Sequence, residues 1–499
     1  MLQMRNIRKV YPDGTEALNN VDFVVKTGEV HGLIGENGAG KTTLMRILSG
    51  LIKPTEGQIL LEGAEVKFQS TRDAIEKGIG IVQQHFALVE NFTVMENLVL
   101  GFEQKTGVIV NQTEVCAEIQ RLSERTGLKV DPDSLIQGLP VGVQQRVEIL
   151  KTLYRGAKIL ILDEPTSVLS PIEVKEFFRT LKNLKEQGTT IILVTHKMPE
   201  VLEACDKITV LRKGRVVGIV DAKESSPEEL ARMMVGREVI LRIKKKEIKP
   251  GKPMIECHEL SVKDDRGFLT INNLSFEVRS GEILAVAGIE GNGQKELVEA
   301  LTGLRKIQGG KILVDSKDVT EELKNLRNLG VAHIPEDKQG RGLVLDFSVS
   351  QNLILGSQES PEFSTRFGMN FKAIHDFARN AIERFGIQTS GDKANVRFLS
   401  GGNQQRVVIA RELSRNPGII IAAQPTRGLD VASTEYVWSL LLKKREEGKG
   451  VLIVTSDLDE AMQLSDRLAV MYRGQFIGLG RPEELTLEQI GLWMGGVRS

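Results

Sequence analysis

Part of the chain has the residue types and spacing of a phosphate-binding loop. The segment 35–42 fits the pattern G-x-x-x-x-G-K-[ST]. In such a loop, backbone N–H groups that glycine leaves uncovered converge on phosphate oxygens at a helix N-terminus. Lys41 would neutralise the β- and γ-phosphate oxygens, and the hydroxyl of Thr42 would ligate Mg²⁺. The candidate contacts of this loop are Gly35, Asn37, Gly38, Ala39, Gly40, Lys41, Thr42 and Thr43.

Acidic and imidazole side chains stand directly after two hydrophobic runs. Asp163 and Glu164 follow the run 159–162, and His196 follows the run 190–194 after one threonine. At the carboxyl end of a buried strand beside a phosphate loop, Asp163 suits the ligand shell of Mg²⁺ and Glu164 suits a general base for water. A lone histidine is more often a packing residue, but at the end of the next strand His196 becomes a candidate sensor of the γ-phosphate.

These patterns return in the second half of the chain with residues exchanged. Gly288 follows Gly35 by 253 residues and opens a loop in which Gln294 and Lys295 replace the lysine and threonine. A later motif shows the opposite trend, because 399–403 reads LSGGN whereas its counterpart, 260 residues earlier, reads LPVGV. Such a long period indicates duplication of a whole domain. We expect the extra residues of the second copy in an intervening helical subdomain.

In both halves, short β-rich runs alternate with helical patterns, which predicts an α/β fold. The central runs are almost continuously apolar, as in parallel strands that are covered on both faces. These runs are 28–34, 157–162, 190–194, 283–287, 418–422 and 451–454. We expect a first domain at 1–237, a linker at 238–252 that includes a solvated basic stretch, and a second domain at 253–499.

Composition narrows the class of protein. Lysine and arginine number 66 and are balanced by 66 acidic residues, whereas a binder of nucleic-acid phosphates usually has a basic excess. Cys116, Cys205 and Cys257 have no metal-binding spacing and fit a reducing compartment. The N-terminus has no apolar leader, and no run reaches 18 apolar residues. We expect that the chain does not cross a membrane by itself.

The order of the motifs resembles the ATP-binding cassette superfamily over the whole chain: phosphate loop, the Leu-Ser-Gly-Gly signature at 399–402, an Asp-Glu pair, then a histidine. The resemblance implies tandem P-loop NTPase domains that bind ATP and Mg²⁺. Each domain would have a RecA-like core, a helical subdomain and an antiparallel β subdomain. It also implies that Tyr11 stacks on adenine, and that Gln84 reaches the metal or the attacking water. In this family the signature caps ATP held by the opposite cassette.

If each signature caps the ATP held by the opposite cassette, the replaced residues all belong to one of two composite sites. One composite site would have Lys41, Gln84, Glu164 and His196 as catalytic residues, Thr42, Gln84 and Asp163 as metal ligands, and Ser400, Gly401, Gly402 and Asp430 as caps. The other would contain Gln294, Lys295, Glu336, Ala423, Gln424 and Ser456, with Pro140, Val141, Val143 and Ser170 as caps. We therefore expect one hydrolytic and one degenerate site. The glycines and Lys295 leave weak nucleotide binding open at the degenerate site.

A fused pair with a degenerate second loop resembles the ATPase subunits of bacterial importers for simple sugars and nucleosides, as does the segment 334–338. The segments 84–98 and 139–151 resemble the nucleoside type. The resemblance implies permease subunits in the membrane as partners, and a periplasmic or lipid-anchored binding protein reached through them. It implies no nucleic acid and no contact with the transported substrate. The chain would lie at the cytoplasmic face of the cell membrane.

The segment after Gln84 is a candidate groove for a cytoplasmic helix of the permease. Its apolar side chains are Phe86, Leu88, Val89 and Phe92. The same residues would also suit interior packing.

Three other classes fit the sequence less well. A twin-cassette ATPase that acts on the ribosome usually has two competent sites and a long charged linker. A DNA-repair cassette ATPase has a long coiled-coil insertion between phosphate loop and signature. A nucleotide sensor without turnover would not need Glu164 and His196.

Overall fold

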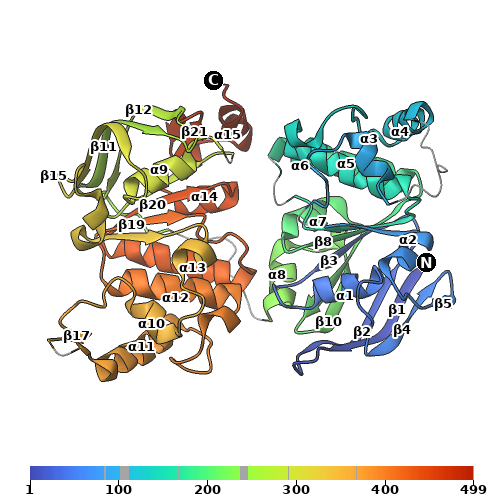
Figure 1. Ribbon diagram of the computed structural model, residues 1–499, viewed down its shortest axis with the longest axis horizontal. Helices are drawn as coiled ribbons and strands as arrows, with labels where there is room; N and C mark the ends of the chain where they lie inside the picture. Colours follow the sequence, from blue (N-terminus) through green and yellow to red (C-terminus); the bar gives the residue numbers. More distant parts are fainter. Residues whose placement is uncertain are drawn as a thin grey trace. The chain divides into compact units, whose positions relative to one another are not determined.

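Two structural units divide the chain, at Met1–Val239 and Ile240–Ser499 (Figure 1). The computed structural model describes residues 1–83, 86–101, 112–166, 169, 171–236, 245–289, 291–366 and 368–497. Each unit contains a four-stranded antiparallel sheet and a six-stranded, mainly parallel sheet. The two units repeat the same strand order, so the predicted duplication and the α/β P-loop fold are confirmed.

In the first unit, the antiparallel sheet has the order β2-β1-β4-β5 and the larger sheet the order β10-β9-β3-β8-β7-β6. The antiparallel strands are β1 (Leu2–Val10), β2 (Glu16–Val25), β4 (Glu56–Leu61) and β5 (Ala64–Val66). The larger sheet holds β3 (Val30–Ile34), β6 (Ile79–Val82), β7 (Ile159–Asp163), β8 (Thr190–Thr195), β9 (Lys207–Arg212) and β10 (Arg215–Asp221). All its pairs are parallel except β9–β10.

The described part of the first unit also contains helices. They are α1 (Lys41–Leu48), α2 (Thr71–Glu76), α3 (Val94–Val99), α4 (Gln112–Thr126), α5 (Val141–Tyr154), α6 (Pro171–Glu186), α7 (Met198–Ala204) and α8 (Pro227–Val235). Leu44, Met45 and Leu48 of α1 pack in one core with side chains of both sheets. The helix that follows the phosphate loop is thus fixed between two layers.

The second unit repeats this plan. Its antiparallel sheet, β12-β11-β14-β15, uses β11 (Pro253–Lys263), β12 (Leu269–Arg279), β14 (Ile307–Val314) and β15 (Lys317–Asp318). Its larger sheet, β16-β19-β20-β13-β21-β22, uses β13 (Ile283–Ala287), β16 (Val331–Ile334), β19 (Ile419–Ala423), β20 (Gly450–Thr455), β21 (Arg467–Tyr472) and β22 (Gln475–Gly480). A small hairpin joins β17 (Ser364–Thr365) to β18 (Gly368–Met369).

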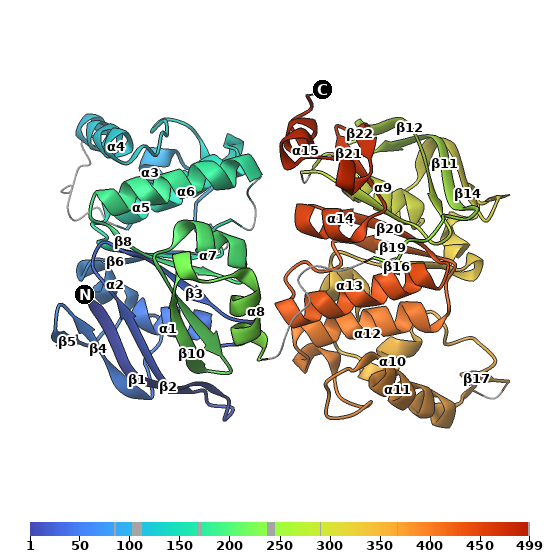
Figure 2. The ribbon, with the colours of Figure 1, turned by 180° about the vertical axis from the view of Figure 1, so that it is seen from behind.

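Helices lie on both faces of the second large sheet (Figures 1 and 2). They are α9 (Gln294–Leu301), α10 (Val349–Ile354), α11 (Phe371–Phe385), α12 (Gly401–Ser414), α13 (Val431–Glu446), α14 (Leu458–Leu464) and α15 (Leu487–Met494). α9 packs in the core shared with the antiparallel sheet, and α12 and α13 pack against the other face. Within the described ranges, no helix is long and apolar enough to span a bilayer.

The extra residues that the sequence placed in an intervening helical subdomain lie mainly in two segments, one before α10 and one between α10 and α11. Ile79 and Val331, which begin equivalent strands, are 252 residues apart, whereas the helix starts Val94 and Val349 are 255 apart. This first gain coincides with a π-helical turn at Lys338–Gly342. The ends of α4 and α11 are 259 residues apart, so most of the remaining gain falls before α11, where the β17–β18 hairpin lies.

Candidate functional site

The phosphate loop of the first unit connects β3 to α1. Gly40 has φ of +106°, and a Cβ atom there would lie 2.7 Å from Cδ2 of Leu18. Only glycine therefore fits this turn. Lys41 is 7% exposed, and its Nζ donates to the carbonyls of Gly35 at 2.7 Å and Glu36 at 3.2 Å. A buried ammonium turned back over an open loop has the position needed to neutralise bound phosphate.

The other predicted loop residues follow this geometry. Asn37, Gly38 and Thr42 are exposed, and Ala39 is buried. The hydroxyl of Tyr11 lies 3.3 Å from Oγ1 of Thr43. The structure thus brings the predicted adenine-stacking residue from the β1–β2 turn to the start of α1.

The acidic residues lie at the carboxyl edge of the large sheet, where β3, β8 and β7 are adjacent. Asp163 ends β7 and pairs in register with Val194 of β8. Nδ1 of His196 lies 2.8 Å from Oε1 of Glu164. Glu164 has φ of +49°, a strained conformation for a residue with a side chain. Its backbone N–H donates to Val194 at 2.8 Å, and this bond holds the strained residue in place.

Electrostatics separate the roles of the two carboxylates. Burial and the neighbouring Glu164 raise the pKa of Asp163, although Lys41 and Arg46 oppose them. Burial also acts to raise the pKa of Glu164, but the hydrogen bond from His196 and the charges of Lys41 and Lys197 outweigh it, and the pKa lies below its usual value. Glu164 is therefore a carboxylate at neutral pH, as a base must be.

A buried network behind Glu164 was not predicted from the sequence. Oε1 of Glu200 accepts a hydrogen bond from Thr166, and Oε2 accepts one from Thr195 at 3.3 Å. Nε2 of Gln145 donates to the carbonyl of Pro165 at 2.7 Å. These bonds fix the turn that carries Glu164 and connect it to α5 and α7. The same residue types recur 260 residues later as Gln405, Thr426 and Glu460, and this repeat in the sequence could have revealed the network.

Gln84, which the sequence placed at the metal and the attacking water, lies outside the described residues, as does Ser170. Of the neighbouring apolar residues, Val89 and Phe92 are 38% and 37% exposed, and Phe86 and Leu88 are half-buried. Val89 and Phe92 are thus not interior packing residues.

The second phosphate loop keeps the backbone of the first but loses its chemistry. Gly293 has φ of +107°, as Gly40 has +106°. Gln294 is 9% exposed and turns back over the loop, but its buried Oε1 has no hydrogen-bond partner in the described part of the chain. Lys295 pairs with Asp265 at 3.2 Å. The ammonium of Lys295, which the sequence suggested for weak nucleotide binding, is thus paired with a carboxylate.

The catalytic turn of the second unit is also preserved in shape. Gln424 has φ of +45°, and its N–H donates to Val454 at 2.8 Å, as Glu164 does to Val194. Its Oε1 accepts from the backbone N–H of Ser456 at 3.1 Å. Ala423 stands at the position of Asp163, so this edge has neither of the two carboxylates of the first unit.

Asp264 is a further replacement that the sequence reading missed. Its N–H donates to Phe268 at 2.9 Å and its carbonyl accepts from Gly267 at 3.1 Å, the same turn that Tyr11 makes with Thr15 and Gly14. An acidic side chain thus stands where the first unit has its aromatic ring. The spacing of 253 residues from Tyr11 would have revealed it.

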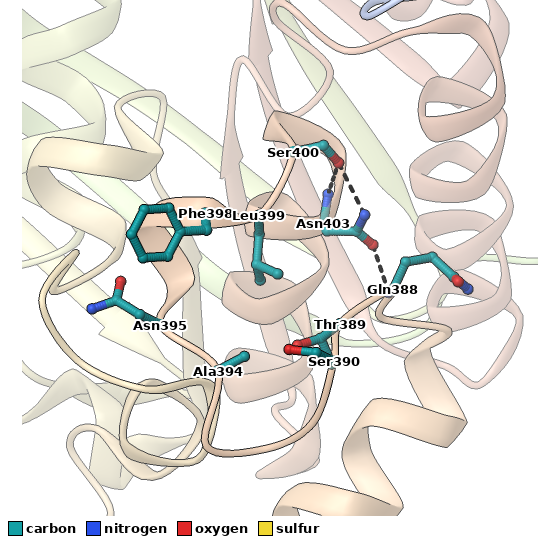
Figure 3. A pocket seen from close by; sticks show the side chains of 9 residues that line it. All are labelled: Gln388, Thr389, Ser390, Ala394, Asn395, Phe398, Leu399, Ser400 and Asn403. Atoms are coloured by element: carbon teal, nitrogen blue, oxygen red, sulfur yellow. Dashed lines mark hydrogen bonds between the residues drawn. The ribbon is translucent and has the colours of Figure 1, made fainter. Parts of the chain in front are cut away.

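The signature begins α12 in the second unit (Figure 3). Ser400 is exposed and caps the helix, accepting hydrogen bonds from the backbone and side-chain amides of Asn403. It borders a cavity of about 590 Å³ that also touches Gln388 and Phe398. Nearby, Asp430 caps α13 by accepting from Ser433 at 2.7 Å. A Cβ on Gly402 would lie 2.4 Å from Oγ of Ser433, so the two helix starts, and with them Ser400 and Asp430, are brought together.

The counterpart in the first unit lacks this cap. Pro140 precedes α5 and makes no side-chain cap hydrogen bond. The first unit therefore has the complete phosphate loop and the acids, and the second unit has the complete signature.

The donor set of the first unit fits Mg²⁺ bound with a nucleotide. A hydroxyl and one carboxylate, Thr42 and Asp163, suit a cation that takes few protein ligands and completes its shell with phosphate and water. Asp163 is half-buried and its pKa is raised, so a divalent cation beside it would compensate a charge that is costly to desolvate. In the described ranges, no group of three or more His, Cys, Asp or Glu is arranged to hold a metal.

Comparison with known proteins agrees with this geometry. The family model described as ABC transporter matches residues 18–167 and 271–427. The chain is 44% identical to the nucleoside import ATP-binding protein NupA of Lactococcus lactis subsp. cremoris (strain MG1363), over 99% of this chain and 98% of that protein. It is 44% identical to the guanosine import ATP-binding protein NupO of Bacillus subtilis (strain 168), over 99% and 97%. It is 38% identical to the ribose import ATP-binding protein RbsA 1 of Rubrobacter xylanophilus (strain DSM 9941), over 98% and 97%.

A solved structure shows the same fold. The archaeal ribosome recycling factor aABCE1, in complex with the ribosomal stalk protein aP1, aligns with 94% of this chain and 88% of its own length. The TM-score is 0.61 and the identity 23%, a likeness of fold alone. Two matches to one family model, over most of both units, and full-length relatives well above 30% identity establish the family. The chain belongs to the ABC transporter family and is an ATPase with two cassettes in tandem.

Proposed function

We propose that the chain is the ATP-hydrolysing subunit of an importer for nucleosides. The observation that carries this proposal is the 44% identity, along almost the whole chain, to two import ATP-binding proteins named for nucleoside and guanosine. The named ribose importer is more distant, at 38%. The aABCE1 likeness extends only to the fold, so action on the ribosome is not favoured.

One composite site would perform hydrolysis. Lys41 and the backbone of the loop would hold the phosphates, and Ser400, Gly401, Gly402 and Asp430 would cap them from the other cassette. Glu164, kept ionised by His196, would take a proton from the attacking water, and His196 would position Glu164 and contact the γ-phosphate. Thr42, Asp163 and Gln84 would hold Mg²⁺, which supplies charge stabilisation to the phosphates.

The other composite site would not hydrolyse ATP. Gln424 and Ser456 have the backbone positions of Glu164 and His196 but provide no base. The orphaned Oε1 of Gln294 and the acidic Asp264 disfavour an anionic nucleotide further. Of the two composite sites, this one would thus not turn over ATP.

Coupling requires partners in the membrane. Permease subunits would receive the force of ATP-driven closure, and the binding protein would deliver substrate to them, so that this chain never touches the substrate. The exposed Val89 and Phe92 would contact a cytoplasmic helix of the permease. The chain would then lie at the cytoplasmic face of the membrane as a peripheral subunit.

Reconstitution tests this proposal. The chain is combined in proteoliposomes with the permease subunits encoded by neighbouring genes and with their binding protein, and the uptake of radiolabelled nucleosides and ribose is measured. We expect ATP-dependent uptake of nucleosides that Glu164→Gln abolishes and Gln424→Ala leaves within about twofold. Uptake of ribose alone would contradict the substrate class, and no stimulation of ATPase by the permease would contradict the importer role.

A further inference from the structure

A carboxyl group of the second unit is buried behind the turn that carries Gln424. Glu460 of α14 is 0% exposed. Its Oε1 accepts hydrogen bonds from the hydroxyl of Thr426 at 2.7 Å and from Nε1 of Trp438 at 3.0 Å. Its Oε2 is also buried, and within the described ranges it accepts no hydrogen bond of ordinary geometry. These surroundings suit a neutral carboxylic acid better than a carboxylate, because burial penalises the charged form.

The equivalent carboxyl group of the first unit has a counter-ion. Glu200 lies 260 residues earlier, and its Oε1 is 3.2 Å from the ammonium of Lys197. In the second unit, Asp457 has the position of Lys197 and caps α14, accepting a hydrogen bond from the N–H of Glu460 at 3.1 Å. Lys197 begins α7 without a side-chain cap, so this kind of helix does not require the aspartate. The second unit thus has a repulsive charge where the first has an attractive one.

Among the groups set against Glu460, only Asp457 carries a charge. The others are Thr426 from the turn after β19, Thr455 from β20 and Trp438 from α13. The strand β13, against which α14 also packs, has only apolar side chains. Burial and the charge of Asp457 raise the pKa of Glu460 to about 7, and the neutral donors oppose this shift only in part. The carboxyl group therefore exchanges its proton near neutral pH.

Glu460 also connects the two segments that flank Asp430. The carbonyl of Thr426 accepts a hydrogen bond at 3.0 Å from the N–H of Leu429, the residue before Asp430. On the other side, Trp438 lies on α13, the helix that Asp430 caps. One hydrogen bond thus joins Glu460 to the turn before Asp430, and a second joins it to the helix that follows.

We propose that Glu460 is a positioning residue for Asp430 that acts only with its proton bound, so that ATP turnover by this chain depends on pH through this carboxyl group. The proposal rests on the proposed function, because Asp430 caps a nucleotide only in the composite site described there. When the proton leaves, a buried carboxylate without a counter-ion remains beside Asp457. The structure relieves this cost by opening the contacts to Thr426 and Trp438. The loop that carries Asp430 is then held less firmly, and turnover slows.

The fluorescence of Trp438 reports the proton on Glu460. The chain has two tryptophans, so Trp493→Phe leaves Trp438 as the only indole in the full-length chain. In this background we expect the emission to titrate between pH 6 and pH 8, with a midpoint near 7. Glu460→Gln should abolish the titration, and Asp457→Lys should move its midpoint down by about one pH unit or more, because it restores the counter-ion. Asp459→Asn, at an exposed acid on the same helix, should leave the midpoint unchanged.

The pH profile of ATPase activity tests the positioning role. The steady-state kcat of the parent chain, Glu460→Gln and Asp457→Lys is measured from pH 6 to pH 9 with the permease subunits present. A group with a pKa near 7 changes from about nine-tenths to about one-tenth protonated between pH 6 and pH 8. We therefore expect the kcat of the parent to fall at least about threefold more over this interval than the kcat of either variant. A merely structural role would lower the kcat of the variants by the same factor at every pH, and parallel profiles of this kind would overturn the proposal.

The two measurements also separate this proposal from the proposed function. A Trp438 titration that Glu460→Gln abolishes, in a chain that supports no ATP-dependent uptake, would keep the proton on Glu460 and remove the importer role on which its effect on turnover rests. ATP-dependent uptake whose pH profile neither variant changes would keep the importer role and overturn the role of Glu460. A titration that persists in Glu460→Gln would show that another group causes it, and would also overturn the proposal.

Discussion

Nδ1 of His196 lies 2.8 Å from Oε1 of Glu164, at the carboxyl edge of the first large sheet. In the second unit, Ser456 and Gln424 meet in the same backbone geometry, with φ near +45° at Gln424. Strain of this kind persists only where the surrounding structure enforces it. The second cassette therefore retains the backbone framework of this turn, although it has Ala423, Gln424 and Ser456 where the first has Asp163, Glu164 and His196.

Removal of the imidazole should change the pH dependence of turnover. The hydrogen bond from His196 is one cause of the lowered pKa of Glu164, so His196→Ala should raise that pKa. A base works only when deprotonated, and activity is lost as the pH falls through its pKa. We expect His196→Ala to lower kcat by about 10²-fold or more and to shift the acidic limb of its residual activity to higher pH. A purely structural loss would lower the rate without moving that limb.

The two phosphate-loop positions should differ in their effect on turnover. Lys41→Ala removes a buried ammonium that points over the loop, and should abolish steady-state ATPase activity. Lys295→Ala removes a side chain paired with Asp265, and should leave most of the activity. Both variants are compared with the permease present. Comparable losses from the two variants would contradict the assignment of one hydrolytic site.

The two signature positions provide a second matched pair. Ser400→Arg places a long cation at the start of α12, where the proposed cap must approach the γ-phosphate, and should lower kcat by at least about 10²-fold. Pro140→Arg makes the same change beside the degenerate site and should cost less than about threefold. Melting temperatures confirm that both variants fold. Equal losses, or a larger loss from Pro140→Arg, would argue against cross-capping.

Glu460 should make the stability of the second unit depend on pH. Burial raises its pKa from 4.5 to about 7, although hydrogen bonds from Thr426, Thr455 and Trp438 oppose this shift. The folded state therefore holds a proton that the unfolded state releases, and stability falls as the pH rises from about 4.5 to about 7. The difference is on the order of 3 kcal/mol, at 1.36 kcal/mol per pKa unit.

Thermal unfolding of Glu460→Gln measures this effect. The amide keeps an acceptor for Thr426 and Trp438 but does not titrate. We expect the melting temperature of the second unit to fall less between pH 5 and pH 8 in the variant than in the parent chain, at matched ionic strength. The same fall in both proteins would show that other groups cause it.

The sequence by itself determined the duplication, the P-loop fold and the candidate residues that stand next to one another in the chain. Phosphate loops and strand-end acids are local motifs, whose chemistry follows from spacing along one backbone segment. The sheet order then placed β8 between β3 and β7, so that Glu164 and His196, 32 residues apart, came within hydrogen-bond distance.

Only the tertiary structure decided the relationships that span long stretches of chain. Lys295 turned to Asp265, and arginines from four separate segments paired with Glu299 and Glu412. Such clusters depend on which side chains share one buried space. Residues that lie far apart in the sequence show no common pattern from which this clustering could be predicted. Buried charges must find partners there, because an unpaired charge in the interior is far more costly than one in water.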